Sequence, residues 1–77
     1  MDWMPLESSG FASAAYSAGE HLLYLEFRSG AVYRYFDFSL QQYSEFLAAD
    51  SKGRYFSEYI RDRFRCQQVR LSHGIAS

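Results

Sequence analysis

Residues 22–36 constrain the fold of this chain more than any other segment, because apolar and polar side chains alternate on both sides of a Ser-Gly pair. Leu23, Leu25 and Phe27 share one face of the first half, since successive residues of a strand point to opposite sides. Ser29-Gly30 then predicts a tight turn into a second strand. The segment is therefore predicted to form a β-hairpin.

The register of this hairpin decides where two tyrosines point. A two-residue loop would place Arg34 opposite Leu25 and bury a guanidinium among aliphatic side chains. A three-residue loop with Gly30 in the left-handed region places Tyr33 opposite Leu25 and Tyr35 opposite Leu23 instead. Because burying an unpaired charge is costly, we predict the second register. It makes Tyr33 and Tyr35 structural and leaves Arg34 beside Tyr24 on the outer face.

The remaining segments complete an α+β pattern. We expect an extended lead over 1–10, a strand at 11–17, a helix over 38–49, a second helix from near Ser51 to Phe64 and a short edge strand at 66–71. Arg63 falls within the apolar arc of the second helix, so it either snorkels or marks the helix end. The prediction is one domain over 1–77, with its core at 6–71 and a frayed tail at 72–77. Its small antiparallel sheet has three to four strands, with two helices packed on one face.

Composition argues against several classes of protein. Cys66 is the only cysteine, so no internal disulfide forms, and with only His21 and His73 beside it a zinc site is not expected. We predict a buried structural Cys66 and a reducing, cytoplasmic setting. No segment approaches the roughly 20 apolar residues of a membrane span, and the first ten residues lack the pattern of a signal peptide. No catalytic constellation is present, so neither an enzyme nor a cofactor is predicted.

Charge is distributed unevenly along the chain. Residues 1–50 hold two basic and seven acidic side chains, whereas residues 51–77 hold six basic and two acidic ones. The basic half could attract a polyanion, or the two halves could neutralise each other across the fold. Both interpretations are compatible with the sequence.

The basic second half suggests an anion-binding surface. Lys52 and Gly53 stand at a predicted helix start, where backbone N–H groups and the helix dipole favour anions, although a capped start with a solvated lysine fits equally. The predicted RNA-binding residues are Lys52, Gly53, Arg54, Arg61 and Arg65 on the helix, with Arg34 and Tyr24 on the hairpin. Tyr33-Arg34-Tyr35 is also typical of a base-stacking platform, but the predicted register turns both tyrosines toward the helices.

The order of several motifs resembles the KTSC domain. The matching residues are Ser8-Ser9, Tyr16, Leu25-x-Phe27, Gly30, Tyr33-x-Tyr35, Tyr43, Ala49-Asp50-Ser51-Lys52-Gly53, Phe56 and Ile60-Arg61, over about residues 6 to 71. This family is named for its occurrence at the C-terminus of some lysyl-tRNA synthetases and also exists as a stand-alone protein. The chain departs from the usual Val-Pro at Phe38-Ser39. The resemblance implies a small binding module with RNA as the suggested ligand.

Two functions therefore follow as expectations. The first is a non-catalytic module that binds tRNA or single-stranded RNA through the basic second helix and its N-terminus. The second is a protein-interaction module that docks on a larger partner through exposed aromatic side chains or an edge strand, since tyrosine and arginine are favoured at interfaces.

Overall fold

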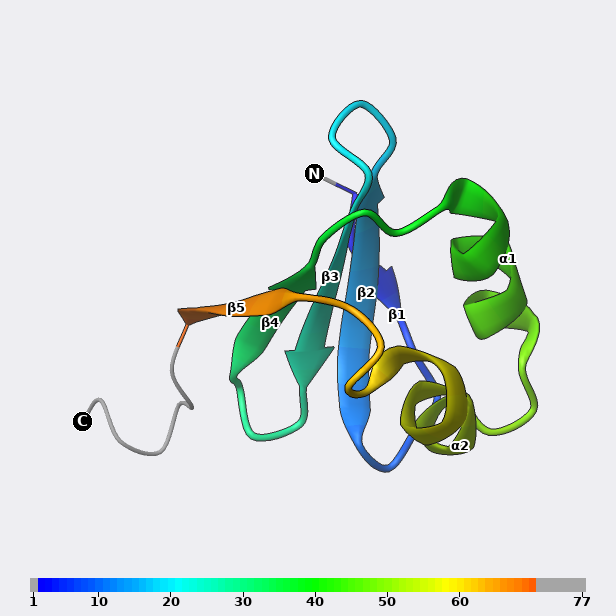
Figure 1. Ribbon diagram of the computed structural model, residues 1–77. Helices are drawn as coiled ribbons and strands as arrows, with labels where there is room; N and C mark the ends of the chain where they lie inside the picture. Colours follow the sequence, from blue (N-terminus) through cyan, green and yellow to red (C-terminus); the bar gives the residue numbers. More distant parts are fainter. Residues whose placement is uncertain (1, 71–77) are drawn as a thin grey trace.

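The computed structural model describes residues 2–70, which form a five-stranded antiparallel sheet with helices on one side (Figure 1). The strands are β1 (Met4–Pro5), β2 (Phe11–Ser17), β3 (Leu22–Phe27), β4 (Val32–Tyr35) and β5 (Cys66–Arg70), and they lie in the sheet in chain order. Between β4 and β5 come α1 (Leu40–Ala48), α2 (Lys52–Tyr55) and the π-helical turn η1 (Phe56–Ile60). The α+β class is confirmed, but the sheet has five strands rather than three to four.

The additional strand is β1, which lies in the segment predicted to be an extended lead. Met4 pairs with Ala14 and Pro5 pairs with Ser13. Two residues are too few to show alternation, and Pro5 lacks the N–H that a central strand would need. Pro5 is tolerated because β1 is an edge strand, with β2 as its neighbour in the sheet.

The predicted hairpin register is confirmed. Leu25 lies opposite Tyr33, Leu23 opposite Tyr35 and Tyr24 opposite Arg34. The Phe27 N–H donates to the Ala31 carbonyl at 2.8 Å, and Gly30 has a φ of 97°. This is the three-residue loop that a left-handed glycine permits.

The second helix is shorter than predicted. It is capped by Ser51, whose hydroxyl accepts from the Arg54 N–H at 3.2 Å, but it ends at Ile60 rather than Phe64. The Arg61 N–H donates to the Phe56 carbonyl at 2.8 Å, and Asp62 then adopts a φ of 60°, which a right-handed helix cannot continue. Arg65 therefore lies outside the helix, between Ile60 and β5.

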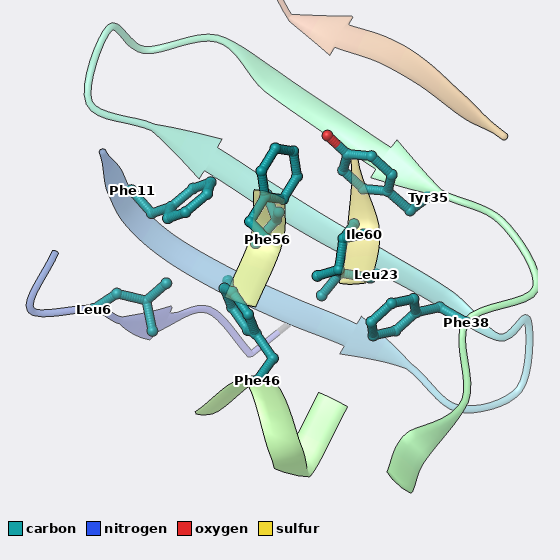
Figure 2. Close-up of a cluster of buried hydrophobic side chains, with 10 residues drawn as sticks. Leu6, Phe11, Leu23, Tyr35, Phe38, Phe46, Phe56 and Ile60 are labelled. Atoms are coloured by element: carbon teal, nitrogen blue, oxygen red, sulfur yellow. The ribbon is translucent and has the colours of Figure 1, made fainter. Parts of the chain in front are cut away.

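Aromatic side chains from the sheet and both helical segments build the core (Figure 2). Its buried members are Leu6, Phe11, Ala14, Leu23, Leu25, Tyr35, Phe38, Phe46, Phe56 and Ile60. The Phe11 ring contacts Phe46 of α1 at 5.9 Å and Phe56 of η1 at 5.3 Å, centroid to centroid. These edge-on contacts join the helices to the sheet.

The exposed edge at β5 corrects another prediction. Every residue of β5 is exposed, so Cys66 is not the buried structural cysteine that we expected. The strand itself was predicted correctly and pairs with β4. Its predicted last residue, 71, and the predicted tail at 72–77 lie outside the described residues.

Two further observations concern residues 2–70. None of their helices is long and apolar enough to cross a membrane. Nor do three His, Cys, Asp or Glu side chains of this range gather as a metal site would require.

Candidate nucleic-acid interface

The sheet has one face that carries the helices and one that no helix of residues 2–70 covers (Figure 1). We call the uncovered side the open face, which carries Trp3, Tyr24, Arg34, Phe36, Arg65 and Gln67. The register across the strands places Ala15 opposite Tyr24, Tyr24 opposite Arg34, and Arg34 opposite Gln67. Paired residues project to the same side of a sheet, so these side chains form one row.

Phe36 brings two arginines of the open face together. The Arg65 guanidinium carbon lies 4.7 Å from the centroid of the Phe36 ring, and that of Arg34 lies 5.6 Å away. The Phe36 N–H donates to the Arg65 carbonyl at 2.9 Å, which extends the pairing of the two chain segments by one step beyond β5. The ring quadrupole favours both cations and holds their charges close to each other.

Arg34 is further oriented by β5. Its Nε donates to Oε1 of Gln67 at 2.8 Å, and its Nη2 donates to the same oxygen. A guanidinium has five N–H donors in a planar fork, so these two bonds leave donors available to a ligand. Arg34 is half-buried and Arg65 is exposed, which makes both accessible from solvent.

A second aromatic group lies at the β1 end of the row. The rings of Trp3 and Tyr24 meet edge to face, with centroids 6.2 Å apart. Residue 15 of β2 lies between them, and its small alanine side chain is fully buried, which lets the two rings meet across the strand. Trp3 remains 41% exposed. The open face thus carries aromatic rings at two places, Trp3 and Tyr24 toward β1 and Phe36 just after β4.

Near the hairpin loop, the positive charge that Arg70 brings to the open face is neutralised by a carboxylate. Arg70 Nη2 forms an ion pair with Oε2 of Glu26 at 2.7 Å, and Arg70 Nε donates to the Gly30 carbonyl at 3.0 Å. The Ser13 hydroxyl donates to the other carboxylate oxygen of Glu26 at 2.7 Å. The excess positive charge of this face therefore lies around Phe36.

The residues predicted at the helix start remain together, but both of their cations are bonded to the protein. The Lys52 ammonium donates to the Ala49 carbonyl at 2.8 Å, at the end of α1. Arg54 pairs with Glu58 at 2.8 Å, and the side chain of Arg54 is 80% exposed. Gly53 is exposed, and a Cβ at this position would contact nothing within 4 Å.

Arg61 lies at a third location, apart from the open face and the helix start. Its guanidinium lies over the Phe56 ring at 5.7 Å, at the end of η1. The predicted binding residues are thus divided into three groups rather than aligned on one helical stripe: the open face with Tyr24, Arg34 and Arg65, the helix start with Lys52, Gly53 and Arg54, and Arg61 at the helix end.

Tyr33 and Tyr35 face the helices. Tyr35 is a buried member of the core, and burial raises the pKa of its hydroxyl well above the usual value, an effect that the Arg61 charge partly offsets. Tyr33 packs against the core with its ring edge-on to Phe27 at 5.6 Å. Neither ring belongs to the open face.

Besides Gln67, the prediction omitted two aromatic residues of the open face. Phe36 follows Arg34 by two positions, so the alternation that placed Arg34 outside could also have found it. Alternation could not place Trp3, because the segment around it was predicted to be an extended lead that pairs with no strand. Its position depends on β1, which only the structure shows.

The helical side carries a different surface feature. Tyr59 is 52% exposed, and its ring lies 4.8 Å from that of Tyr55, centroid to centroid. The two rings line a shallow hollow together with Ala49. The Tyr55 hydroxyl donates to Oε1 of Glu45 at 3.0 Å and ties α2 to α1.

Known proteins are similar to this chain in sequence or in fold. A protein of Tsukamurella paurometabola is 38% identical over 61 residues, which cover 79% of this chain and 91% of that protein. The lysine–tRNA ligase of Trichormus variabilis is 36% identical over 63 residues, covering 82% of this chain but 11% of the ligase. The crystal structure of a KTSC domain protein from Yersinia pestis superposes with a TM-score of 0.86 at 29% identity, covering 90% of this chain and 97% of that one.

The family model for the KTSC domain matches residues 7–64. These residues span the sheet from before β2 to the turn after η1 and include both the hairpin and the helices. The chain belongs to the KTSC domain family.

Proposed function

We propose that this chain is a non-catalytic, cytoplasmic module that binds RNA, with the open face as its main contact surface. The observation that carries the proposal is the placement of two guanidiniums on the Phe36 ring, on the face that no helix of residues 2–70 covers. Arginine donors bind phosphate oxygens, and aromatic rings stack with bases. The similarity to lysine–tRNA ligases makes tRNA the first RNA to test.

A filter-binding titration at several salt concentrations tests this function. Affinity for tRNA and single-stranded RNA should fall as salt rises, because phosphate contacts release counterions. Changing both Arg34 and Arg65 to Gln should weaken binding and reduce the log–log salt slope by about 1.4, at ~0.7 per phosphate contact on a single strand. Absence of binding at low salt, or affinity independent of salt, would contradict the proposal.

Arg54→Gln is the matched control for the surface. It removes the same charged group from the helix start, where Arg54 already pairs with Glu58. We expect this variant to retain the salt slope of the unchanged protein. If Arg54→Gln reduced the slope by about 0.7, as the loss of one phosphate contact would, and the open-face changes did not reduce it, the contact surface would be the helix start.

Docking on a protein partner is the second candidate, and Tyr59 is the observation that favours it. An aromatic ring that is half exposed beside a hollow is a common interface anchor. A pull-down with and without nuclease distinguishes the two functions. Docking predicts a partner that survives nuclease and is lost with Tyr59→Ser, whereas RNA binding predicts a partner that nuclease removes.

A further inference from the structure

We infer that the open face takes unpaired RNA, with one base stacked at the Phe36–Arg65 pair and another on Trp3. This inference rests on the proposed function and names its ligand class. It depends on the aromatic side chains of the open face, whereas the salt-dependence test of the general proposal depends only on the cations. The two ideas can therefore fail separately.

The first step concerns what aromatic rings can contact in RNA. Bases within a duplex are stacked on each other, and proteins recognise such RNA mainly through its shape, its phosphates and its 2′-hydroxyls. Exposed rings on a sheet can stack only with bases that have left a helix. The open face presents Trp3 at 41% exposure and a half-buried Phe36. These rings favour a single strand over a duplex.

The second step concerns the Phe36–Arg65 pair. Arg65 is exposed and its guanidinium lies 4.7 Å from the ring centroid, so the pair presents a planar cation beside an aromatic surface. A guanidinium plane stacks with bases as a ring does, and its N–H groups also reach phosphate oxygens. Arg34 contributes a second cation at the same ring. One nucleotide can therefore find both a stacking surface and a counter-charge here.

The third step concerns the distance between the two stacking positions. Trp3 directly precedes β1, and Phe36 directly follows β4. Three inter-strand spacings of about 4.8 Å separate these strands, or about 14 Å across the sheet. Four-stranded RNA-binding sheets stack two or three bases. Tyr24 of β3 and Arg34 of β4 lie on the strands between the two rings and give the RNA strand further contacts along the way.

Trp3 is the only tryptophan of the chain, so its fluorescence reports on one end of the proposed path. The protein is titrated with a short single-stranded oligoribonucleotide, with an RNA hairpin stem of equal phosphate number, and with inorganic polyphosphate. We expect saturable quenching with the single strand and tighter binding of it than of the stem. Polyphosphate should bind through charge without the same quenching.

Phe36→Leu tests the other end, because leucine keeps apolar bulk and removes the ring. A stacked base contributes roughly 1 to 3 kcal/mol, so single-strand affinity should fall about 5- to 150-fold. Affinity for polyphosphate should stay within about twofold of the unchanged protein. Tyr59→Leu removes an exposed ring from the helical side and should leave single-strand affinity unchanged.

The outcomes separate this inference from the general function. Equal affinity for the strand and the stem, with no quenching of Trp3, would overturn the inference and leave RNA binding in place. Absence of any salt-dependent RNA binding would overturn both. The quenching measurement uses the unchanged protein, so the inference stays testable even if Phe36→Leu unfolds.

Discussion

Tyr35 shows how a single residue of the hairpin serves the fold rather than a ligand. Its ring is 5% exposed and contacts Phe56 edge-on at 5.8 Å. Burial raises the pKa of its hydroxyl above the usual value of about 10, so the neutral form is strongly preferred in the folded protein. The unfolded chain ionises at lower pH. The stability contributed by this preference is complete below about pH 10 and is lost as the pH rises further.

We therefore expect the free energy of unfolding to decrease above pH 10, and Tyr35→Phe to reduce that decrease. Denaturant titrations of both proteins between pH 8 and pH 11 measure this pH dependence of the free energy of unfolding. Tyr59→Phe is the control for removing a hydroxyl from an exposed ring. An unchanged pH dependence in Tyr35→Phe would contradict the assignment.

The position of a side chain could be predicted where the free-energy cost of burying it excluded one of two possible registers. The charge of Arg34 excluded one register of the hairpin, and the structure has the other. Cys66 shows the limit of this reasoning, because a small apolar thiol is compatible with a core and with an exposed edge. Its exposure follows from the position of β5 in the sheet, which is a property of the assembled fold.

At the scale of elements, Lys52 has a structural role at the junction between α1 and α2. Its ammonium donates to the Ala49 carbonyl, which lies just after the last residue of α1. Helix ends leave carbonyls without an intrahelical partner, and a cation there is favourable. The Ser51-Lys52-Gly53 segment thus closes one helix and begins the next. A prediction about stability follows from this contact.

Lys52→Met should lower the free energy of unfolding by about 1 to 2 kcal/mol, because a half-buried hydrogen bond from a charged group is lost. Arg54→Gln removes one charge from the same segment, where the ion pair is exposed, and should produce no measurable change. Urea unfolding of both variants checks this. Equal stability of the two variants would show that the Lys52 contact contributes nothing.

Element types could be predicted more reliably than element ends. The apolar spacing identified both helices, and Ser39 and Ser51 accept the capping hydrogen bonds expected of helix starts. The end of the second helix depends on the left-handed conformation of Asp62, which periodicity does not reveal. Arg63 in the apolar arc was the one sequence signal of an earlier end.

At the scale of the whole molecule, the basic second half of the chain does not form one basic surface. Arg65 joins Arg34 on the open face, Arg70 neutralises Glu26 at its corner, and Arg54 pairs with Glu58 on the helical side. Sequence order therefore showed the excess of basic residues in this half but not where each of them lies in the fold. The placement of Arg65 and Arg70 depends on β5 returning beside β4 after both helices.

The order of the strands has a consequence for larger proteins that carry this fold. Because the sheet follows chain order, β1 and β5 are its two edges, and the chain enters at one edge and leaves at the other. A domain tethered ahead of Asp2 would emerge beside Trp3, and one tethered after Arg70 would emerge four strand spacings away, about 19 Å. The open face would then lie between the two tethers, which would place the proposed RNA-binding surface between the neighbouring domains.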